Sequence, residues 1–210
     1  MLSDEEAMDA ALALARSMLG RTAPNPSVGC VIVRDGRIVG RGATQAGGRP
    51  HAEAMALAEA RALAKGATAY VTLEPCAHRS PRGPACADGL IAAGVARVVA
   101  SMVDPDPRTA GAGLARLADE GIAVETGLGA DDARCILAGF VHRLATGRPL
   151  VWADADPETY DGAFELGFRE TFEQALERMG RAGLMRLRVE PESPLALALA
   201  ARGLLAEAWR

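Results

Sequence analysis

Three residues that are far apart along the chain, His51, Cys76 and Cys86, place the strongest constraint on how this sequence can fold. Imidazole nitrogen and thiolate sulfur are good zinc ligands, and a catalytic zinc site has three protein ligands and one open position. If these side chains bind one ion, the segments that carry them must meet at one point of the fold. The sequence therefore predicts one Zn²⁺ per chain, held by His51, Cys76 and Cys86.

The residues beside these ligands indicate the chemistry. A His-x-Glu pattern at His51 to Glu53, followed later by Pro-Cys and a second Cys, is the order found in zinc deaminases. Zinc lowers the pKa of a bound water, and Glu53 would carry protons from that water to a ring nitrogen and to the departing amine. Two alternatives are ordinary helical and buried residues, or a closed structural zinc site with His78 as the fourth ligand.

The composition favours a small-molecule substrate over a polynucleotide. The 210 residues have a formal net charge of −4 without a basic run, and only 4% are aromatic. A nucleic-acid groove normally shows clustered Lys and Arg, and unpaired bases stack on aromatic side chains. No leader pattern and no uncharged apolar run of about 18 residues is visible, so we expect a cytoplasmic protein with no membrane and no nucleic-acid partner.

Hydrophobic spacing predicts alternating helices and strands. Ser3 and Glu6 form a capping box, and Asp35-Gly36 is a strong hairpin signal. We expect helices over residues 4–19, 51–65, from 86 onward, 112–120 and 131–145, and strands over residues 28–34, 37–43, 69–73, 95–102 and 122–126. This order predicts a mixed sheet of about five strands between layers of helices, with the site at the strand ends.

Two polar loops are candidates for ligand contacts. Asn25 lies between two prolines, which suits either a plain turn or an amide held out toward a ligand. Asp104 and Asp106 each precede a proline at the end of a predicted strand, where a carboxylate can contact a ligand or simply face solvent.

Several motifs together resemble a known family. The motifs are Pro24-Asn25-Pro26-Ser27-Val28-Gly29, Pro50-His51-Ala52-Glu53, Thr72-Leu73-Glu74-Pro75-Cys76-Ala77-His78, Asp104-Pro105-x-Pro107 and Gly139-Phe140-x-His142-Arg143-x-x-x-Gly147-Arg148-Pro149. Over about residues 4–150 they resemble the riboflavin-biosynthesis pyrimidine deaminase, which is usually the N-terminal half of a bifunctional deaminase/reductase. The resemblance is specific, because generic base deaminases have two residues between the Cys ligands and this chain has nine.

The resemblance implies a three-layer α/β/α cytidine-deaminase-like fold with a mixed five-stranded sheet. It implies hydrolytic removal of the ring amine of 2,5-diamino-6-ribosylamino-4(3H)-pyrimidinone 5′-phosphate as ammonia. In this family the residues at Asn25 and Asp104 hold the substrate, and the residue at His78 lies beside the pocket. Family members form dimers or larger assemblies, so we expect a homodimer or a larger homo-oligomer.

Some positions depart from the family pattern. The loop between the Cys residues usually carries a Lys or Arg for the phosphate, and here Arg79 and Arg82 are both candidates, of which Arg82 enters our predicted site. Thr44 replaces a His and Asp106 replaces an Asn, which removes donors and adds negative charge. These departures keep two alternatives open, namely a different, unphosphorylated amino-heterocycle as substrate and a non-catalytic zinc-binding scaffold.

We predict a deaminase domain over residues 1–148 and a short, degenerate reductase-like α/β tail over residues 149–210. In the tail we expect a linker over 152–165, a helix over 170–180, a strand over 184–189 and a helix over 194–205. By resemblance, a Val-Glu-Gly-Gly turn would approach a dinucleotide, but this chain has Val189-Glu190-Pro191-Glu192. The glycines that permit close backbone approach are missing, so we expect neither NADPH binding nor reductase activity.

Overall fold

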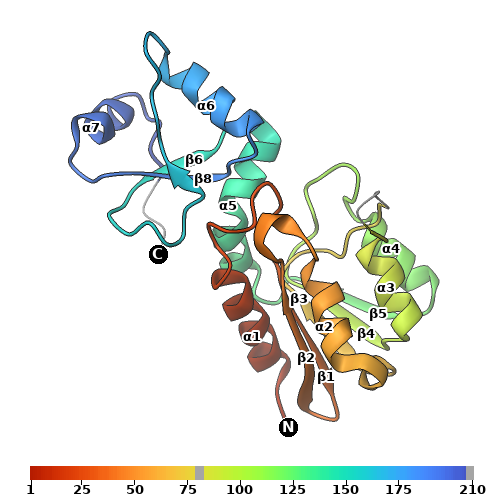
Figure 1. The fold of residues 1–210 in the computed structure, drawn as a ribbon. Helices are drawn as coiled ribbons and strands as arrows, with labels where there is room; N and C mark the ends of the chain where they lie inside the picture. Colours follow the sequence, from red (N-terminus) through yellow and green to blue (C-terminus); the bar gives the residue numbers. More distant parts are fainter. Residues whose placement is uncertain (79–82, 207–210) are drawn as a thin grey trace.

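The computed structural model describes residues 1–78 and 83–206. Figure 1 shows two parts, a larger one built on a five-stranded sheet and a smaller one that follows the long helix α5. The N-terminus belongs to the larger part and the C-terminal segment to the smaller one.

The larger part contains the predicted mixed sheet. Its strand order is β2-β1-β3-β4-β5, in which β1 pairs antiparallel with β2 and β3, while β3, β4 and β5 are parallel. The strands are β1 (Gly29–Arg34), β2 (Arg37–Ala43), β3 (Thr68–Val71), β4 (Arg97–Ala100) and β5 (Ala123–Thr126). The parallel strands end on one edge of the sheet, which is where the loops that bear Cys76 and Asp104 begin.

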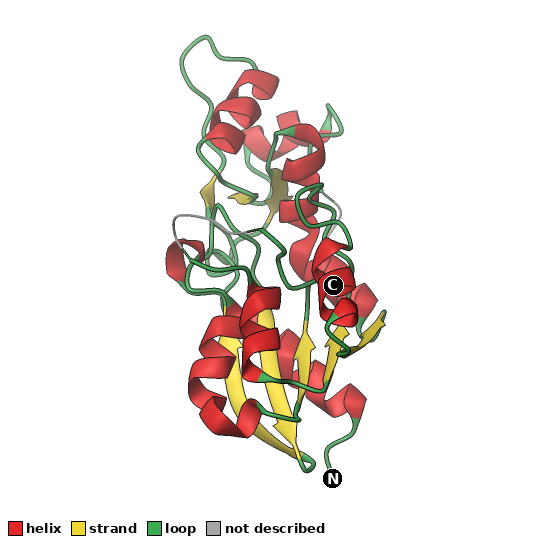
Figure 2. Ribbon diagram, turned by 90° about the vertical axis from the view of Figure 1, so that its right-hand side faces the viewer, coloured by secondary structure: helices red, strands yellow, loops and turns green. Residues whose placement is uncertain are grey.

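Helices cover both faces of this sheet, which confirms the predicted three-layer fold (Figures 1 and 2). Helices α1 and α5 pack on one side, and α2, α3 and α4 pack on the other. Their bounds are α1 (Asp4–Arg16), α2 (Ala52–Ala60), α3 (Cys86–Ala93), α4 (Ala112–Asp119) and α5 (Ala130–Thr146). The interior between the layers is aliphatic and rich in Ala, Val and Leu, so the helices can approach the sheet closely.

The local signals that the sequence predicted are present. The capping box at the start of α1 joins the Ser3 hydroxyl to the Glu6 amide and the Glu6 carboxylate to the Ser3 amide. Asp35 and Gly36 both have positive φ, at 52° and 69°, as a tight two-residue hairpin requires. Helix α2 ends earlier than predicted, because a 3₁₀ turn, η2 (Arg61–Ala64), replaces its last turn.

The smaller part has more structure than the sequence indicated. It contains a parallel sheet of order β6-β8-β7, formed by β6 (Leu150–Ala153), β7 (Gly162–Ala163) and β8 (Arg186–Val189), with α6 (Phe172–Arg181) and α7 (Pro194–Ala200). The predicted linker over 152–165 was therefore wrong at both of its ends. Buried Val151 and Phe164 draw these segments into a second hydrophobic cluster with Leu176 and Leu187.

The packing of α1 on the sheet depends on a close backbone approach at Gly29. A Cβ atom placed on Gly29 would lie 1.9 Å from the carbonyl oxygen of Ala11 in α1. No side chain fits there unless the helix moves away from β1. Among the described residues no helix is long and apolar enough to cross a membrane.

We predict that Gly29→Ala lowers the free energy of unfolding by about 1–3 kcal/mol, because α1 must shift away from β1 to accommodate the methyl group. Denaturant unfolding followed by circular dichroism measures the change. Gly162→Ala is the matched control, since a Cβ atom there meets nothing within 4 Å. Equal stability of Gly29→Ala and Gly162→Ala would contradict this account of the α1–β1 contact.

Candidate functional site

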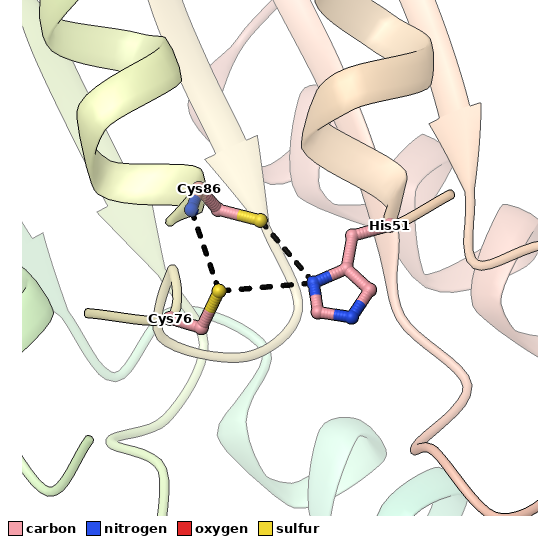
Figure 3. A group of neighbouring side chains, drawn as sticks. All are labelled: His51, Cys76 and Cys86. Atoms are coloured by element: carbon pink, nitrogen blue, oxygen red, sulfur yellow. Dashed lines mark hydrogen bonds between the residues drawn. The ribbon is translucent and has the colours of Figure 1, made fainter. Parts of the chain in front are cut away.

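The three predicted zinc ligands meet at one point (Figure 3). The Nδ1 atom of His51 lies 3.3 Å from the Sγ atom of Cys86 and 3.8 Å from the Sγ atom of Cys76. All three potential ligand atoms lie within 4.8 Å of one another. Residues separated by 35 positions in the sequence are thus brought to one site by the fold.

Two helix N-termini and one strand end place these side chains. His51 is the N-cap residue of α2, and Cys86 is the first residue of α3. Cys76 lies in the loop after β3, and its sulfur accepts a hydrogen bond from the backbone amide of Cys86 at 3.3 Å. The unpaired amides and the positive dipole end of both helices favour anionic groups at this point.

The donor set and its spacing fit a zinc ion. Ligand atoms 2.0–2.3 Å from a tetrahedral zinc lie about 3.5–3.8 Å apart, close to the nitrogen–sulfur distances here. The thiol of Cys86 donates to the sulfur of Cys76, which lowers the pKa of Cys76 and raises the pKa of Cys86. One thiolate is therefore already favoured without a metal, and zinc binding would displace the proton that the pair still holds.

Glu53 lies in the first turn of α2, two positions after His51, and is only 4% exposed. Burial raises the pKa of its carboxyl group, and the neighbouring His51 opposes the rise. A buried carboxyl group whose pKa is raised can both accept and donate a proton near neutral pH. Glu53 therefore has the environment of a proton carrier beside the three zinc-ligand candidates.

A cavity of about 580 Å³ opens beside these residues. His51, Glu53 and Cys76 line it, together with three of the residues predicted to contact substrate, namely Asn25, His78 and Asp104. Arg82, the fourth of these, lies outside the described residues. A volume of this size is typical of pockets that enclose a small molecule.

Asn25 is held at the rim of this cavity. Its Nδ2 atom donates to the carbonyl oxygen of Gly48 at 2.8 Å and lies 3.4 Å from Nε2 of His51. Gly48 has φ of +86°, and a Cβ atom there would lie 2.6 Å from the Asn25 side chain. The glycine-rich loop before α2 therefore fixes the orientation of an amide beside the metal-ligand candidates.

Glu74 organises the neighbouring wall, a role that the sequence analysis missed. This carboxylate is 3% exposed and accepts hydrogen bonds from four backbone amides, those of Asp104, Gly111, Gly113 and Leu114. It thereby joins the loop after β4 to the N-terminus of α4, where a negative charge is stabilising. A methyl group on Gly113 would lie 1.9 Å from the carbonyl oxygen of Pro75, so α4 is also pressed against the segment that bears Cys76.

Asp104 and Asp106 lie on this loop in different environments. Burial raises the pKa of Asp104 to about 6, while the backbone amide of Asp106 donates to its carboxylate and opposes the rise. The side chain of Arg108 binds the Asp106 carboxylate and holds its pKa below the usual range. Asp106 therefore carries the negative charge that the sequence led us to expect, and Arg108 balances it.

Three arginines that line the cavity were absent from the predicted site, Arg49, Arg108 and Arg143. Arg49 precedes the Pro50-His51 motif and Arg143 lies within the motif that begins at Gly139, so a signal existed for both. Arg108 follows Pro107 directly, but only the folded loop shows that its guanidinium group returns to Asp106.

Replacing Glu74 by Gln should lower the free energy of unfolding by about 2–4 kcal/mol, because the amide NH₂ group would face buried backbone N–H groups that lose their acceptor. Denaturant unfolding measures this, with Glu120→Gln as the control, since Glu120 is an exposed residue at the end of α4. An equal change in both variants would rule out the bridging role of Glu74.

The pH dependence of stability should report the raised pKa of Asp104. Because this pKa lies above the value in the unfolded chain, the stabilisation of the folded state by protonated Asp104 is complete below about pH 4. It is lost as the pH rises through about 6. Asp104→Asn has no such proton to lose. The thermal midpoint of the variant should therefore rise relative to that of the wild type as the pH increases from about 4 to about 7.

Thermal denaturation at several pH values in this range measures the difference in midpoint between variant and wild type. Asp119→Asn, at an exposed position in α4, is the control and should show a constant difference. A constant difference for Asp104→Asn as well would mean that its carboxyl group has an ordinary pKa in the folded protein.

Comparison with known proteins is consistent with this geometry. The family described as the cytidine and deoxycytidylate deaminase zinc-binding region matches residues 1–102. The riboflavin biosynthesis protein RibD of Escherichia coli is 56% identical over 150 residues, which cover 71% of this chain and 41% of that protein. The chain thus spans about two fifths of the length of this relative.

Solved structures show the same relationship. RibD of Acinetobacter baumannii superposes with a TM-score of 0.80 at 27% identity and covers 96% of this chain and 84% of its own, so the likeness extends into the smaller part. The deaminase/reductase of Thermotoga maritima superposes with a TM-score of 0.66 at 39% identity and covers 70% of this chain and 42% of its own.

A shorter relative decides the family. The diaminohydroxyphosphoribosylamino-pyrimidine deaminase of Buchnera aphidicola is 47% identical over 139 residues, which cover 65% of this chain and 94% of that protein. Because this relative is matched almost from end to end, the chain belongs to the family of riboflavin-biosynthesis diaminohydroxyphosphoribosylaminopyrimidine deaminases.

Proposed function

We propose that this protein is a zinc-dependent aminohydrolase that converts 2,5-diamino-6-ribosylamino-4(3H)-pyrimidinone 5′-phosphate and releases ammonia. The observation that carries the proposal is the buried Glu53 carboxyl group beside the convergent His51, Cys76 and Cys86 side chains at one end of a substrate-sized cavity. The Buchnera relative, named for this pyrimidine deaminase activity, supports the choice of substrate.

His51, Cys76 and Cys86 would hold the zinc ion. Zinc with these three ligands supplies the Lewis acidity that makes a water molecule nucleophilic near neutral pH. The protein supplies the rest of the site: the two helix N-termini stabilise the thiolates, and the Cys86 amide fixes the sulfur of Cys76. The mutual hydrogen bonds of the ligands preform the site and so reduce the entropy that ordering it would otherwise cost.

Glu53 is the proposed general acid and base. It would accept one proton from the attacking water and deliver it to the ring nitrogen next to the reacting carbon. It would then take the remaining proton from the hydroxyl group added to that carbon and deliver it to the amine, which leaves as ammonia while the carbonyl forms. Burial raises the pKa of this carboxyl group, which allows it to hold a proton between these steps. Its place in the first turn of α2, next to His51, keeps it near the reacting atoms.

Asn25 and Asp104 are the proposed contacts for the polar edge of the ring. The Asn25 amide is fixed by Gly48, and Asp104 is fixed by the Asp106 amide and by the loop that Glu74 anchors. Both are therefore oriented before the substrate arrives, which lowers the entropic cost of binding. A carboxyl group of raised pKa at Asp104 suits hydrogen bonding to an aminopyrimidine, because it can donate as well as accept.

The arginines that line the cavity support a phosphorylated substrate. Arg49 and Arg143 add positive charge to the walls, and Arg108 neutralises Asp106. The Nδ1 atom of His78 and the Nε atom of Arg49 are buried without a hydrogen-bond partner among the described residues, and both residues line the cavity. Guanidinium groups bind phosphate oxygens strongly and with defined geometry.

Thr44 has a structural role, which explains why a threonine can replace the family histidine at this position. Its hydroxyl oxygen accepts the backbone N–H of Val28 at 3.1 Å, and its own amide donates to the Val28 carbonyl at 2.8 Å. Thr44 lines the cavity, but these hydrogen bonds hold it in the part of the wall next to β1. The unphosphorylated substrate that Thr44 and Asp106 first suggested is therefore the weaker alternative.

We further propose that residues 1–148 form the deaminase domain and residues 149–210 a degenerate reductase-like tail. The likeness to RibD of Acinetobacter baumannii, which covers 96% of this chain, supports a reductase-like origin of the tail. Pro191 and Glu192 stand where the family resemblance expects glycines, which supports the absence of NADPH chemistry. A cytoplasmic homodimer or larger homo-oligomer remains the proposal that the resemblance implies.

Replacing Glu53 by Gln should lower kcat/KM about 10²- to 10⁴-fold, because the amide cannot carry protons between water, ring and amine. Ammonia release from the phosphorylated diaminopyrimidinone measures turnover, and atomic absorption measures zinc, which should stay at one ion per chain. Glu59→Gln is the control, because Glu59 lies on the same helix, exposed and paired with Arg41.

Full activity of Glu53→Gln with zinc bound would refute the role of Glu53. If the zinc-loaded wild type releases no ammonia from the phosphorylated compound but does so from an unphosphorylated aminopyrimidine, the reaction class stands and the substrate assignment is wrong.

A further inference from the structure

The smaller part of the molecule follows helix α5 and contacts the loop after α1 (Figure 1). Three positions show how tight this contact is. A Cβ atom on Gly183 would lie 2.8 Å from Cβ of Pro24, one on Gly20 would lie 2.6 Å from the Tyr160 carbonyl oxygen, and one on Gly139 would lie 2.6 Å from the Met185 carbonyl oxygen. Pro24 and helix α5 both contribute to the cavity wall, so the smaller part supports the wall from behind.

Arg143 connects the two parts through its side chain. It lies on α5, is half-buried and lines the cavity. Its Nε atom donates a hydrogen bond of 2.8 Å to the carbonyl oxygen of Gly180, which is in the last turn of α6. A residue of the cavity wall is therefore oriented by a backbone group that belongs to the smaller part.

The position of Gly180 depends on another close contact. A Cβ atom on Gly180 would lie 1.9 Å from the carbonyl oxygen of Gly147, the residue that ends α5. Only a glycine lets α6 approach α5 this closely, and this approach brings the Gly180 carbonyl within reach of Arg143. The contact thus determines where the guanidinium group of Arg143 is held.

We propose that residues 150–206 are a positioning element for the deaminase pocket, and that they hold Arg143 as a cation for the substrate phosphate. This inference rests on the proposed function only for the identity of the phosphorylated ligand. Arginine binds phosphate through a planar group with a fixed arrangement of N–H donors, so its orientation matters as well as its charge. Holding Nε in the free protein leaves the terminal nitrogens for a ligand and reduces the ordering cost of binding.

Arg108, which also lines the cavity, is used differently from Arg143. Arg108 donates from Nε and a terminal nitrogen to Asp106, so its charge is already balanced within the loop. Arg143 instead donates from Nε to a neutral carbonyl, and the buried carboxyl group of Asp161 lies close enough to interact with its charge. The Gly180 carbonyl orients this cation without neutralising it.

Gly180→Ala tests the contact from the side of the smaller part. Alanine is the better helix former, so the substitution favours α6 itself, and a loss reports the displaced contact with Gly147 and Arg143. Gly203→Ala is the matched control, because it also lies in the smaller part and a Cβ atom there meets nothing within 4 Å. Its positive φ of 65° gives the control a backbone strain that Gly180→Ala does not have.

Titration calorimetry measures the affinity of the zinc-loaded full chain for ribose 5-phosphate, and ribose is the uncharged reference. We expect Gly180→Ala and Arg143→Gln each to weaken ribose 5-phosphate binding about tenfold, as for loss of one hydrogen bond to a charged group. Gly203→Ala should bind like the wild type. In the double variant the two losses should not add, because both act on one contact.

Additive losses, or an unchanged affinity in Gly180→Ala, would overturn the proposal, and so would a wild type that does not bind ribose 5-phosphate. If Gly180→Ala does not fold, Arg143→Lys decides the question: it keeps the charge but lacks the Nε–H that Gly180 holds. We expect Arg143→Lys to bind about tenfold more weakly, and wild-type affinity would overturn the proposal.

The proposed function can fail separately. Ribose 5-phosphate binding that depends on Gly180, without ammonia release from the diaminopyrimidinone, would refute the proposed function and support the positioning role. Ammonia release with a KM that is the same in Gly180→Ala and the wild type would support the proposed function and refute the positioning role.

Discussion

The packing of α2 against α3 brings the imidazole of His51 and the sulfur of Cys86 to the same point at the N-terminal ends of both helices, where the sulfur of Cys76 meets them. Most of the other site features serve this arrangement. The parallel strand β3 delivers Cys76 to the helix ends, and the Cys86 amide holds its sulfur. The glycine-rich loop before α2 fixes Asn25 against His51. A shift of either helix would separate the ligand atoms and remove the favourable helix-end electrostatics together.

The second constraint is the burial of several carboxyl groups. Each buried charge would destabilise the fold unless hydrogen bonds or an opposite charge stabilised it. Glu74 accepts hydrogen bonds from four backbone amides, which stabilise its buried charge and fix the loop that carries them. Asp106 is neutralised by Arg108. Glu53 and Asp104 are compensated less completely, and burial raises the pKa of both. Groups with raised pKa values next to metal-ligand candidates are typical of a site that moves protons.

The smaller part lacks the glycines expected of a dinucleotide-binding turn, but the proposed positioning role gives it another use. Its sheet and its own hydrophobic cluster give it enough structure to support another surface. That surface is the back of the deaminase cavity, where Gly180, Gly183 and Tyr160 meet α5 and the loop after α1. Under the proposed positioning role, the fold of the smaller part affects the candidate site through these contacts.

The sequence by itself predicted His51, Glu53, Cys76 and Cys86 as the candidate site residues. It also determined the helix caps and the hairpin, because these depend on residue type and on short spacings. It also indicated the mixed sheet, through the alternation of hydrophobic patterns. Only the tertiary structure decided that Glu74 joins two segments, that Arg108 neutralises Asp106, and that Arg143 is held by Gly180. Strands β6 and β7 were missed for the same physical reason. They are short, and what stabilises them is pairing with β8 and burial against α6, contacts that residue spacing along the chain does not encode.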